Sequence, residues 1–354
     1  MIELRNEEQR KKYVHDLWIE LFEEEPYQIT DNFIDIGVLN FVYMARSNNK
    51  IIYLKQALED AKNKAKIRED LANILKERIQ YENKYIEVIG KELPDKIELP
   101  KILKYDKENN ILVLSDVKKD GILLETSMLN GDFNEKTAYY LGKFLGISHE
   151  KTLGKKIVIR GDEEEDLMNW YVFLNMRTKG ILQKEKFPEN VQYEIKKLHD
   201  EVKNKYTYDV VVNIDCCPKN VFERNDGSLG IIDFELSSGV GDPAYDLGFL
   251  MGHYLLIGVI RRDKIQEAIN SMRQILVGYD QEMRDFKDKN YDTRLIKYAG
   301  AAMIYRITGS STAHYIKVED ISLIKEIGFN LITNKFEIGF NSVFEFLKEY
   351  LLKN

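Results

Sequence analysis

The stretch that decides the fold runs from Val211 to Phe249, "VVNIDCCPKNVFERNDGSLGIIDFELSSGVGDPAYDLGF", and it holds five aspartates among apolar runs. Because burying an unpaired carboxylate is costly, acids in such a stretch need partners or a chemical role. The pattern predicts a buried strand that runs into Asp215, followed by a hairpin that turns at Asp226–Gly227. Since the two ends of a hairpin lie close together, we expect Asn220 and Asp233 side by side, with Asp215 one loop away.

Two oxygen donors side by side form a site for a hard cation such as Mg²⁺, completed by water and phosphate oxygens. A third carboxylate next to that site can accept a proton from a hydroxyl group. The pattern therefore predicts phosphoryl transfer, in which positioning and charge neutralisation provide most of the catalysis. The alternative is that these aspartates and the asparagine are turn and cap residues, as isolated Asp and Asn usually are.

Composition limits the possible functions. A net charge of −7 argues against a general nucleic-acid binder, which needs a basic surface. Two adjacent cysteines cannot build a disulfide framework, so we expect a reducing, cytoplasmic location. We expect no signal peptide and no membrane partner, because the first residues lack an apolar segment and the longest apolar run, "LGFLMGHYLLIGVI", is short for a bilayer. That run predicts a buried helix.

The 354 residues are enough for two lobes. A helix near the N-terminus precedes a three-stranded antiparallel meander from Gln28 to Lys55, a charged helical region to Pro94, and two strands around the turn "KENN". We therefore predict an α+β fold with a five-stranded small lobe over 1–114, a hinge near Leu114–Val117, and a mostly helical lobe over 115–354. The helices expected in the second lobe cover 134–152, 164–178, 189–203, 243–260, 263–285, 291–309 and 319–352.

The order D-x-x-x-x-N followed by D-F-x resembles the catalytic loop and metal-binding motif of the protein kinase-like fold. The tail "IDFELSSGVGDPAYDLGF" looks like the aminoglycoside phosphotransferase and choline kinase-like branch, whose members phosphorylate small molecules. The A-P-E motif of protein kinases does not occur in the sequence, which disfavours a protein kinase. The resemblance implies a two-lobed fold, ATP and Mg²⁺ as cofactors, Asp215 as the catalytic base, and Asn220 and Asp233 as metal ligands.

The resemblance extends upstream of that motif. "IGVLNFVYMA", with Gly37, is similar to the family's phosphate-covering hairpin, and "IIYLKQA" is similar to the strand that carries its ATP-binding lysine, here Lys55. A lysine on an edge strand is the alternative interpretation. The following helix implies a glutamate partner for this lysine, for which Glu82 is our choice and Glu77 and Glu87 are rivals. A solvated helix face is the alternative for Glu82.

The remaining predicted contacts concern adenine and the acceptor. "NILVLSDV" looks like the hinge strand, so the backbone of Ser115 and Val117 would contact the adenine. Glu235 and Arg306 are the candidate substrate contacts, and helix packing with a surface arginine is the favoured alternative for Arg306. Methylthioribose kinase-like proteins have an arginine in a comparable late helix, which favours a sugar-like substrate over the other acceptor classes, amino alcohols and aminoglycosides. In either class the partner is a small molecule with a hydroxyl group.

Some positions depart from the family pattern or have a structural explanation. Asn213 and Ile214 stand where the family usually has His-Gly, so a pseudokinase-like module that binds nucleotide without catalysis is the alternative function. Asp242 is expected to cap the helix that starts at Pro243, and Asp246 to steady the catalytic loop. Other residues for which we expect ordinary packing roles are Cys216, Cys217, His149 and His253.

Overall fold

The computed structural model describes residues 2–34, 40–58, 77–91, 93–283, 286, 288–309, 311–333, 336 and 339–353. The chain forms two compact units, and their composition confirms the predicted α+β class. The β-rich unit consists of Met1–Glu92, Glu98–Lys119 and Gly230–Leu236, and the helical unit of Leu93–Ile97, Asp120–Leu229 and Ser237–Asn354. The β-rich unit thus runs past the predicted boundary at 114, and it includes the segment with Asp233 because that segment packs against Lys55.

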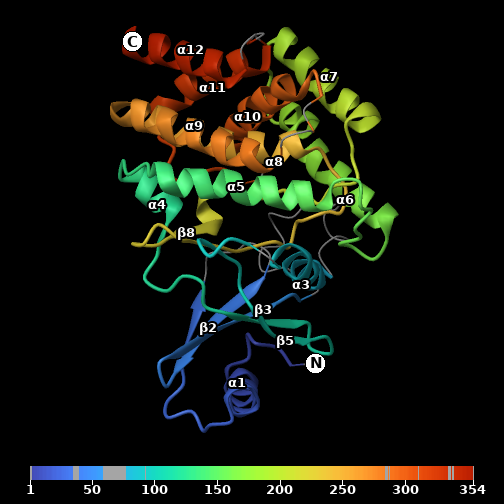
Figure 1. Ribbon diagram of the computed structural model, residues 1–354, viewed down its shortest axis with the longest axis vertical. Coiled ribbons are helices and arrows are strands. Elements are labelled where there is room, and N and C mark those ends of the chain that lie inside the picture. The colour runs from blue at the N-terminus through green and yellow to red at the C-terminus, as the bar shows by residue number, and fades with distance from the viewer. Residues whose placement is uncertain are drawn as a thin grey trace. The chain divides into compact units, whose positions relative to one another are not determined.

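One antiparallel five-stranded sheet organises the β-rich unit, in the order β1-β2-β3-β6-β5 (Figure 1). Lys55 on β3 lies opposite Val42 on β2 and Leu112 on β6. Its strand is therefore internal, which excludes the edge-strand interpretation of this lysine. The strands are β1 (Thr30–Ile34), β2 (Phe41–Ser47), β3 (Lys50–Gln56), β5 (Ile102–Asp106) and β6 (Ile111–Ser115).

Two described helices belong to this unit. Helix α1 (Glu7–Phe22) begins at the N-cap Asn6, whose side chain accepts a hydrogen bond from the Gln9 amide at 3.1 Å. Its apolar residues Leu17 and Trp18 pack on one face of the sheet. Helix α3 (Arg78–Ile89) carries Glu82 on its buried face. The predicted charged helical region before α3 and the hairpin residue Gly37 lie outside the described residues.

Nine α-helices are described in the helical unit, six of them close to predicted ranges. The ranges are α4 (Leu124–Leu129), α5 (Glu135–Thr152), α6 (Glu163–Arg177), α7 (Glu189–Lys205), α8 (Pro243–Ile260), α9 (Ile265–Glu282), α10 (Tyr291–Thr308), α11 (Val318–Thr333) and α12 (Phe340–Lys353). The helix predicted over 319–352 is wrong, since α11 and α12 are separate and Gly339, before α12, adopts a left-handed backbone with φ of 57°. Apolar periodicity continues through this break and conceals it.

Closely packed helix pairs stabilise the helical unit, notably α5 with α9 and α8 with α10 (Figure 1). A Cβ atom on Gly142 of α5 would lie 1.9 Å from the Ile275 carbonyl oxygen of α9, so only glycine allows this approach. Helix α8 is long and apolar enough to cross a membrane by length and composition, but 94% of it is buried inside the protein. The prediction of a buried helix is confirmed.

Residues 221–231 fold as a hairpin of β8 (Val221–Glu223) and β9 (Leu229–Ile231). Gly227 occupies the turn with φ of 74°, as predicted. These strands belong to a short sheet of order β4-β9-β8-β7, with β4 at Ile97–Glu98 and β7 at Ile122–Leu123. The strand predicted to run into Asp215 is wrong: the segment is buried but pairs only through isolated bridges, such as Val212 with Ser238.

Candidate active site

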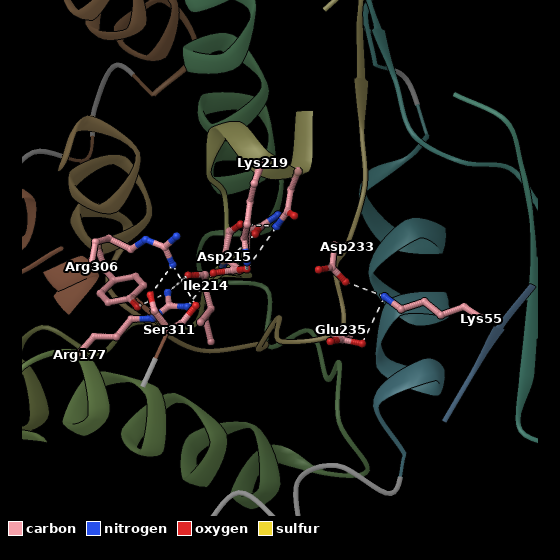
Figure 2. A network of polar contacts seen from close by, with 12 residues as sticks. Lys55, Arg177, Ile214, Asp215, Lys219, Asp233, Glu235, Arg306 and Ser311 are labelled. Atoms are coloured by element: carbon pink, nitrogen blue, oxygen red, sulfur yellow. Dashed lines mark hydrogen bonds and ion pairs between the residues drawn. The ribbon is translucent and has the colours of Figure 1, made fainter. Parts of the chain in front are cut away.

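In the β-rich unit three carboxylates surround one ammonium group. The Lys55 Nζ atom lies 2.6 Å from Asp233 Oδ1, 2.7 Å from Glu82 Oε2 and 3.2 Å from Glu235 Oε2. Figure 2 shows the lysine side chain pointing toward Asp233 and Glu235. Of the three glutamates considered as partner of Lys55, Glu82 is therefore the one that pairs with it. We call these four residues the lysine cluster.

Burial and charge set the ionisation of the lysine cluster. Burial raises the pKa of Glu82 from 4.5 to about 7, against the attraction of Lys55. Burial also raises the pKa of Glu235. Burial alone would lower the pKa of Lys55, but the carboxylates around it raise that pKa well above its ordinary value. The ammonium group is thus charged, and it lies among three carboxyl groups, of which Glu82 becomes fully ionised only above about pH 7.

These three carboxylates could bind a divalent cation that competes with the Lys55 ammonium lying among them. Carboxylate oxygens of Glu82, Asp233 and Glu235 all lie within 4.8 Å of one another. Oxygen ligands with excess negative charge are what Mg²⁺ prefers. Asp233 has the most exposed side chain of the cluster, 31% accessible, and its backbone φ of 72° is unusual for a residue other than glycine. Strained backbone of this kind concentrates at functional sites.

Two further residues hold the lysine cluster in place. Arg78 donates from Nε to the side-chain oxygen of Asn40, and the Asn40 amide group donates to Glu235. The charge of Arg78 offsets part of the burial cost of Glu235. Glu235, predicted as a substrate contact, thus lies next to Lys55 and Asn40. Sequence reasoning missed Asn40 and Arg78, because a turn asparagine and an arginine in a charged helix carry no local signal.

In the helical unit the arrangement is the reverse: two cationic side chains lie next to one carboxylate, that of Asp215. Its Oδ1 atom accepts a hydrogen bond from Arg177 Nη2 at 2.7 Å, and its Oδ2 atom lies 3.1 Å from Lys219 Nζ. Asn220 Nδ2 lies 3.2 Å from the same Oδ2 and 3.0 Å from the Asp215 carbonyl oxygen. We call Asp215, Arg177, Lys219 and Asn220 the aspartate cluster (Figure 2).

The charges around Asp215 favour its carboxylate form. Burial alone would raise its pKa, but the charges of Lys219 and Arg177 outweigh burial and hold the pKa below its ordinary value. Asn220 uses its amide nitrogen toward Asp215, so its carboxamide oxygen is the atom that could bind a cation. The site therefore offers an ionised proton acceptor beside a neutral oxygen donor.

The backbone before the base is held from several directions. Asp246 accepts hydrogen bonds from the amides of Asn213 at 2.6 Å and Ile214 at 2.8 Å, as expected for a residue that steadies this loop. Asp246 in turn lies 3.2 Å from His149 Nε2. His149 thus supports Asp246 and is more than a packing residue.

Other predicted residues occupy clear structural positions. Asp242 caps α8 by accepting from the Ala244 amide at 3.1 Å. Arg306 on α10 donates to the Ser311 carbonyl at 2.6 Å, so within the described structure it holds the turn after its own helix (Figure 2). The Ser115 amide donates to the Lys101 carbonyl at 3.0 Å, which takes this N–H group away from a nucleotide. Val117 is buried.

Comparison with known proteins gives a consistent fold. No protein-family model matches the sequence, and no curated protein matches it. Among solved structures, the choline kinase LicA from Streptococcus pneumoniae has a TM-score of 0.50 and 17% identity, with 98% of this chain and 99% of that chain covered. The macrolide 2'-phosphotransferase MphH from Brachybacterium faecium has a TM-score of 0.50 and 13% identity, covering 92% and 99% of the two chains. For an ethanolamine kinase from Plasmodium vivax the TM-score is 0.50 and the identity 15%, over 95% and 91%. The chain has the kinase-like fold that these small-molecule kinases and phosphotransferases share.

Proposed function

We propose that this protein is a small-molecule kinase that transfers the γ-phosphoryl group of Mg-ATP to a hydroxyl group. The observation that carries the proposal is the buried Lys55–Glu82 ion pair with Asp233 2.6 Å from the same ammonium group. A lysine, a helix glutamate and a metal-binding aspartate are the parts that position nucleotide phosphates and their metal in kinase-type catalysis.

Each residue then has a defined task. Lys55 would bind the nucleotide phosphates, and Asp233 and Asn220 would be the ligands of Mg²⁺, which when bound would supply neutralisation of phosphate charge. Asp215 accepts the proton of the acceptor hydroxyl, because it is ionised and its loop is held by Asp246 and Arg177. Val117 contributes the proposed adenine contact through its backbone, and Ser115 would contribute its carbonyl group.

The acceptor we propose is a sugar-like molecule, an amino alcohol or an aminoglycoside. Supporting this class, the proteins of similar fold are a choline kinase, an ethanolamine kinase and a macrolide phosphotransferase, all acting on small molecules. Arg306, beside the Ser311 turn, is the candidate for acceptor contact on the helical side. A cytoplasmic location is part of the same proposal.

A coupled assay of ADP release, run over a panel of hydroxylated metabolites, tests the proposal. We expect one acceptor class to raise ADP release well above the rate with ATP alone, and Asp215→Ala to abolish the increase while ATP still binds. Full activity in Asp215→Ala would show that another group is the base. Tight nucleotide binding without any hydrolysis would favour the alternative, a pseudokinase-like binding module, which Asn213 and Ile214 in place of His-Gly suggest.

A further inference from the structure

Arg177, the last residue of α6, contacts the catalytic loop at consecutive residues. Its Nη2 atom donates to Asp215 Oδ1 at 2.7 Å, and its Nη1 atom donates to the carbonyl oxygen of Ile214. Nη1 also donates to the Tyr245 hydroxyl of α8 at 2.8 Å. One guanidinium group therefore joins α6, the catalytic loop and α8.

The loop residue that Arg177 contacts is strained. Ile214 adopts a left-handed backbone with φ of 70°, a conformation that β-branched residues avoid. Its side chain is fully buried, so a glycine there would lose apolar packing. The peptide is held on both sides, by Asp246 at the amide and by Arg177 at the carbonyl. Such strain persists only where the surroundings over-determine it.

Aromatic rings fix the guanidinium group itself. The Arg177 Cζ atom lies 4.0 Å from the ring centre of Phe249 and 5.6 Å from that of Tyr305. Stacking and hydrogen bonding use the planar shape of the guanidinium, which a lysine ammonium cannot reproduce. The Arg177 side chain is only 6% exposed, whereas that of Lys219 on the other carboxylate oxygen is 34% exposed. Arg177 is thus the buried partner of Asp215 and Lys219 the accessible one.

We infer that Arg177 is the positioning residue of the base: it fixes the Asp215 carboxylate and the strained Ile214 peptide in the orientation that proton transfer needs. The inference rests on the proposed function. It extends that function to α6, a helix that lies outside the kinase-like motif. It also explains how the loop keeps its shape with Asn213 and Ile214 at the positions of the family's His-Gly.

The chain offers a matched control in a second buried arginine–aspartate pair. Arg294 Nε donates to Asp242 Oδ2 at 2.7 Å, and the guanidinium carbon lies 3.9 Å from the Tyr206 ring centre. This pair has the same chemistry and the same burial, but Asp242 caps α8 instead of accepting a proton. Loss of either arginine removes one partner of a buried ion pair, whereas only Arg177 touches the base.

The experiment compares Arg177→Met, Arg177→Lys and Arg294→Met with the wild type under saturating Mg-ATP. Met keeps the length and the apolar stem, and Lys keeps the charge, so the Lys variant provides a folded protein if Met does not. We expect kcat for phosphoryl transfer to fall by about 100-fold in Arg177→Met and by about 10-fold or more in Arg177→Lys. A displacement of the base by about 1 Å is enough to lower the rate by that factor. The KM for Mg-ATP should stay within about threefold of the wild-type value, because the substitutions change the position of the base and not the binding of the nucleotide.

Arg294→Met should lower the melting temperature but keep the kcat of the folded enzyme. A kcat within threefold of wild type in both Arg177 variants, or an equal loss of kcat in Arg294→Met, would overturn the inference. If the wild type transfers phosphate to no acceptor and hydrolyses no ATP, the proposed function fails instead. Crystal structures of the Arg177 variants then decide the positioning role: a moved Asp215 carboxylate or a relaxed Ile214 supports it, and an unchanged loop refutes it.

Discussion

The lysine cluster of the β-rich unit and the aspartate cluster of the helical unit are opposites in charge. In the first, three carboxylates surround the Lys55 ammonium, with Arg78 further out beyond Asn40. In the second, one carboxylate, Asp215, lies between two cations. Both clusters are largely buried. Water therefore does not fully screen the excess charge of either cluster.

The opposite charges of the two clusters favour different ligands. Buried charge is expensive unless it is paired, so an unbalanced cluster gains most from the ligand that completes it. The excess of acidic groups in the lysine cluster favours binding of a divalent cation. The excess of cationic groups in the aspartate cluster favours binding of an anion such as a phosphoryl group. Asp233 of the lysine cluster and Ile214, the residue before Asp215 of the aspartate cluster, both have a left-handed backbone.

The largest expected effect comes from removing one negative charge of the lysine cluster. Asp233→Asn keeps the shape of the side chain but leaves two carboxylates for Lys55 and a weaker cation site. We expect the Mg²⁺ dependence of ATP binding to disappear and kcat/KM to fall by about 1,000-fold or more, since metal and positioning act together. Titration calorimetry with ATP, with and without Mg²⁺, measures the first effect.

Asp226→Asn is the matched control for that substitution. Asp226 sits on the turn of the same hairpin and pairs with Lys96 at 3.1 Å on the surface. The same chemical change there should leave Mg²⁺-dependent ATP binding within twofold of wild type. Retention of the Mg²⁺ effect in Asp233→Asn would remove the argument that the excess negative charge serves a cation.

The second prediction removes the accessible cation of the aspartate cluster. Lys219→Met should lower kcat/KM by about 10- to 100-fold, because a phosphoryl group loses one charge-assisted contact in a site with little water. The loss should shrink as ionic strength rises. Steady-state kinetics over a salt series measure both effects.

Lys179→Met is the corresponding control, because Lys179 also pairs with an aspartate, Asp200, at 2.5 Å in the helical unit. Its loss should change kcat/KM less than twofold. Equal effects of the two substitutions would mean that Lys219 acts only as a general surface charge.

The sequence predicts the lysine cluster better than the aspartate cluster. Lys55 stands out because it interrupts an apolar strand, and the helix that follows narrows its partner to a few glutamates. Asp233 follows in a recognisable D-F-x motif. These signals locate each residue separately, and it is the resemblance to the kinase-like family that implies their association, since Lys55 and Asp233 lie 178 residues apart.

Arg177 carries no such signal, since it lies 38 residues before Asp215 and resembles any basic residue at the end of a helix. Asn40 is 195 residues from Glu235, and a contact of that range leaves no periodicity to detect. The same limit explains the wrong strand before Asp215. Its valines have the pattern of a strand, but pairing depends on a partner segment near Ser238 that offers only isolated bridges.

The third prediction uses the opposite pKa shifts of the two clusters in metal-free protein. The pKa of Glu82 is raised from 4.5 to about 7 by burial. Between these values the folded state keeps a proton that the unfolded state has lost, so stability falls as pH rises through this window. Wild type should therefore lose stability relative to Glu82→Gln from pH 4.5 to 7, with a slope difference of up to about one proton.

Chemical denaturation at a series of pH values with EDTA measures this difference. Asp215 supplies the control of opposite sign, because Lys219 and Arg177 hold its pKa below 3.8 despite burial. Its contribution is present above 3.8 and is lost as pH falls further, so Asp215→Asn should differ from wild type in slope only in acid. A flat difference between wild type and Glu82→Gln from pH 4.5 to 7 would contradict the raised pKa.

The smallest expected effect restores the family's histidine before the base, in Asn213→His. Asn213 already accepts a hydrogen bond from the Asp215 amide at 3.0 Å through its side-chain oxygen, while Asp246 and Arg177 hold the neighbouring peptide. With the loop held by these groups, a histidine has little left to stabilise, so kcat should change by less than about threefold, and crowding at this buried position should lower the melting temperature by a few degrees.

In the Arg177→Lys background the same substitution should recover part of the lost kcat, because the histidine then supplies support that the arginine no longer gives. A large gain of kcat from Asn213→His in the wild-type background would show that Arg177 leaves the aspartate cluster under-supported, and would weaken the contrast between a loop held from α6 and one held by its own histidine.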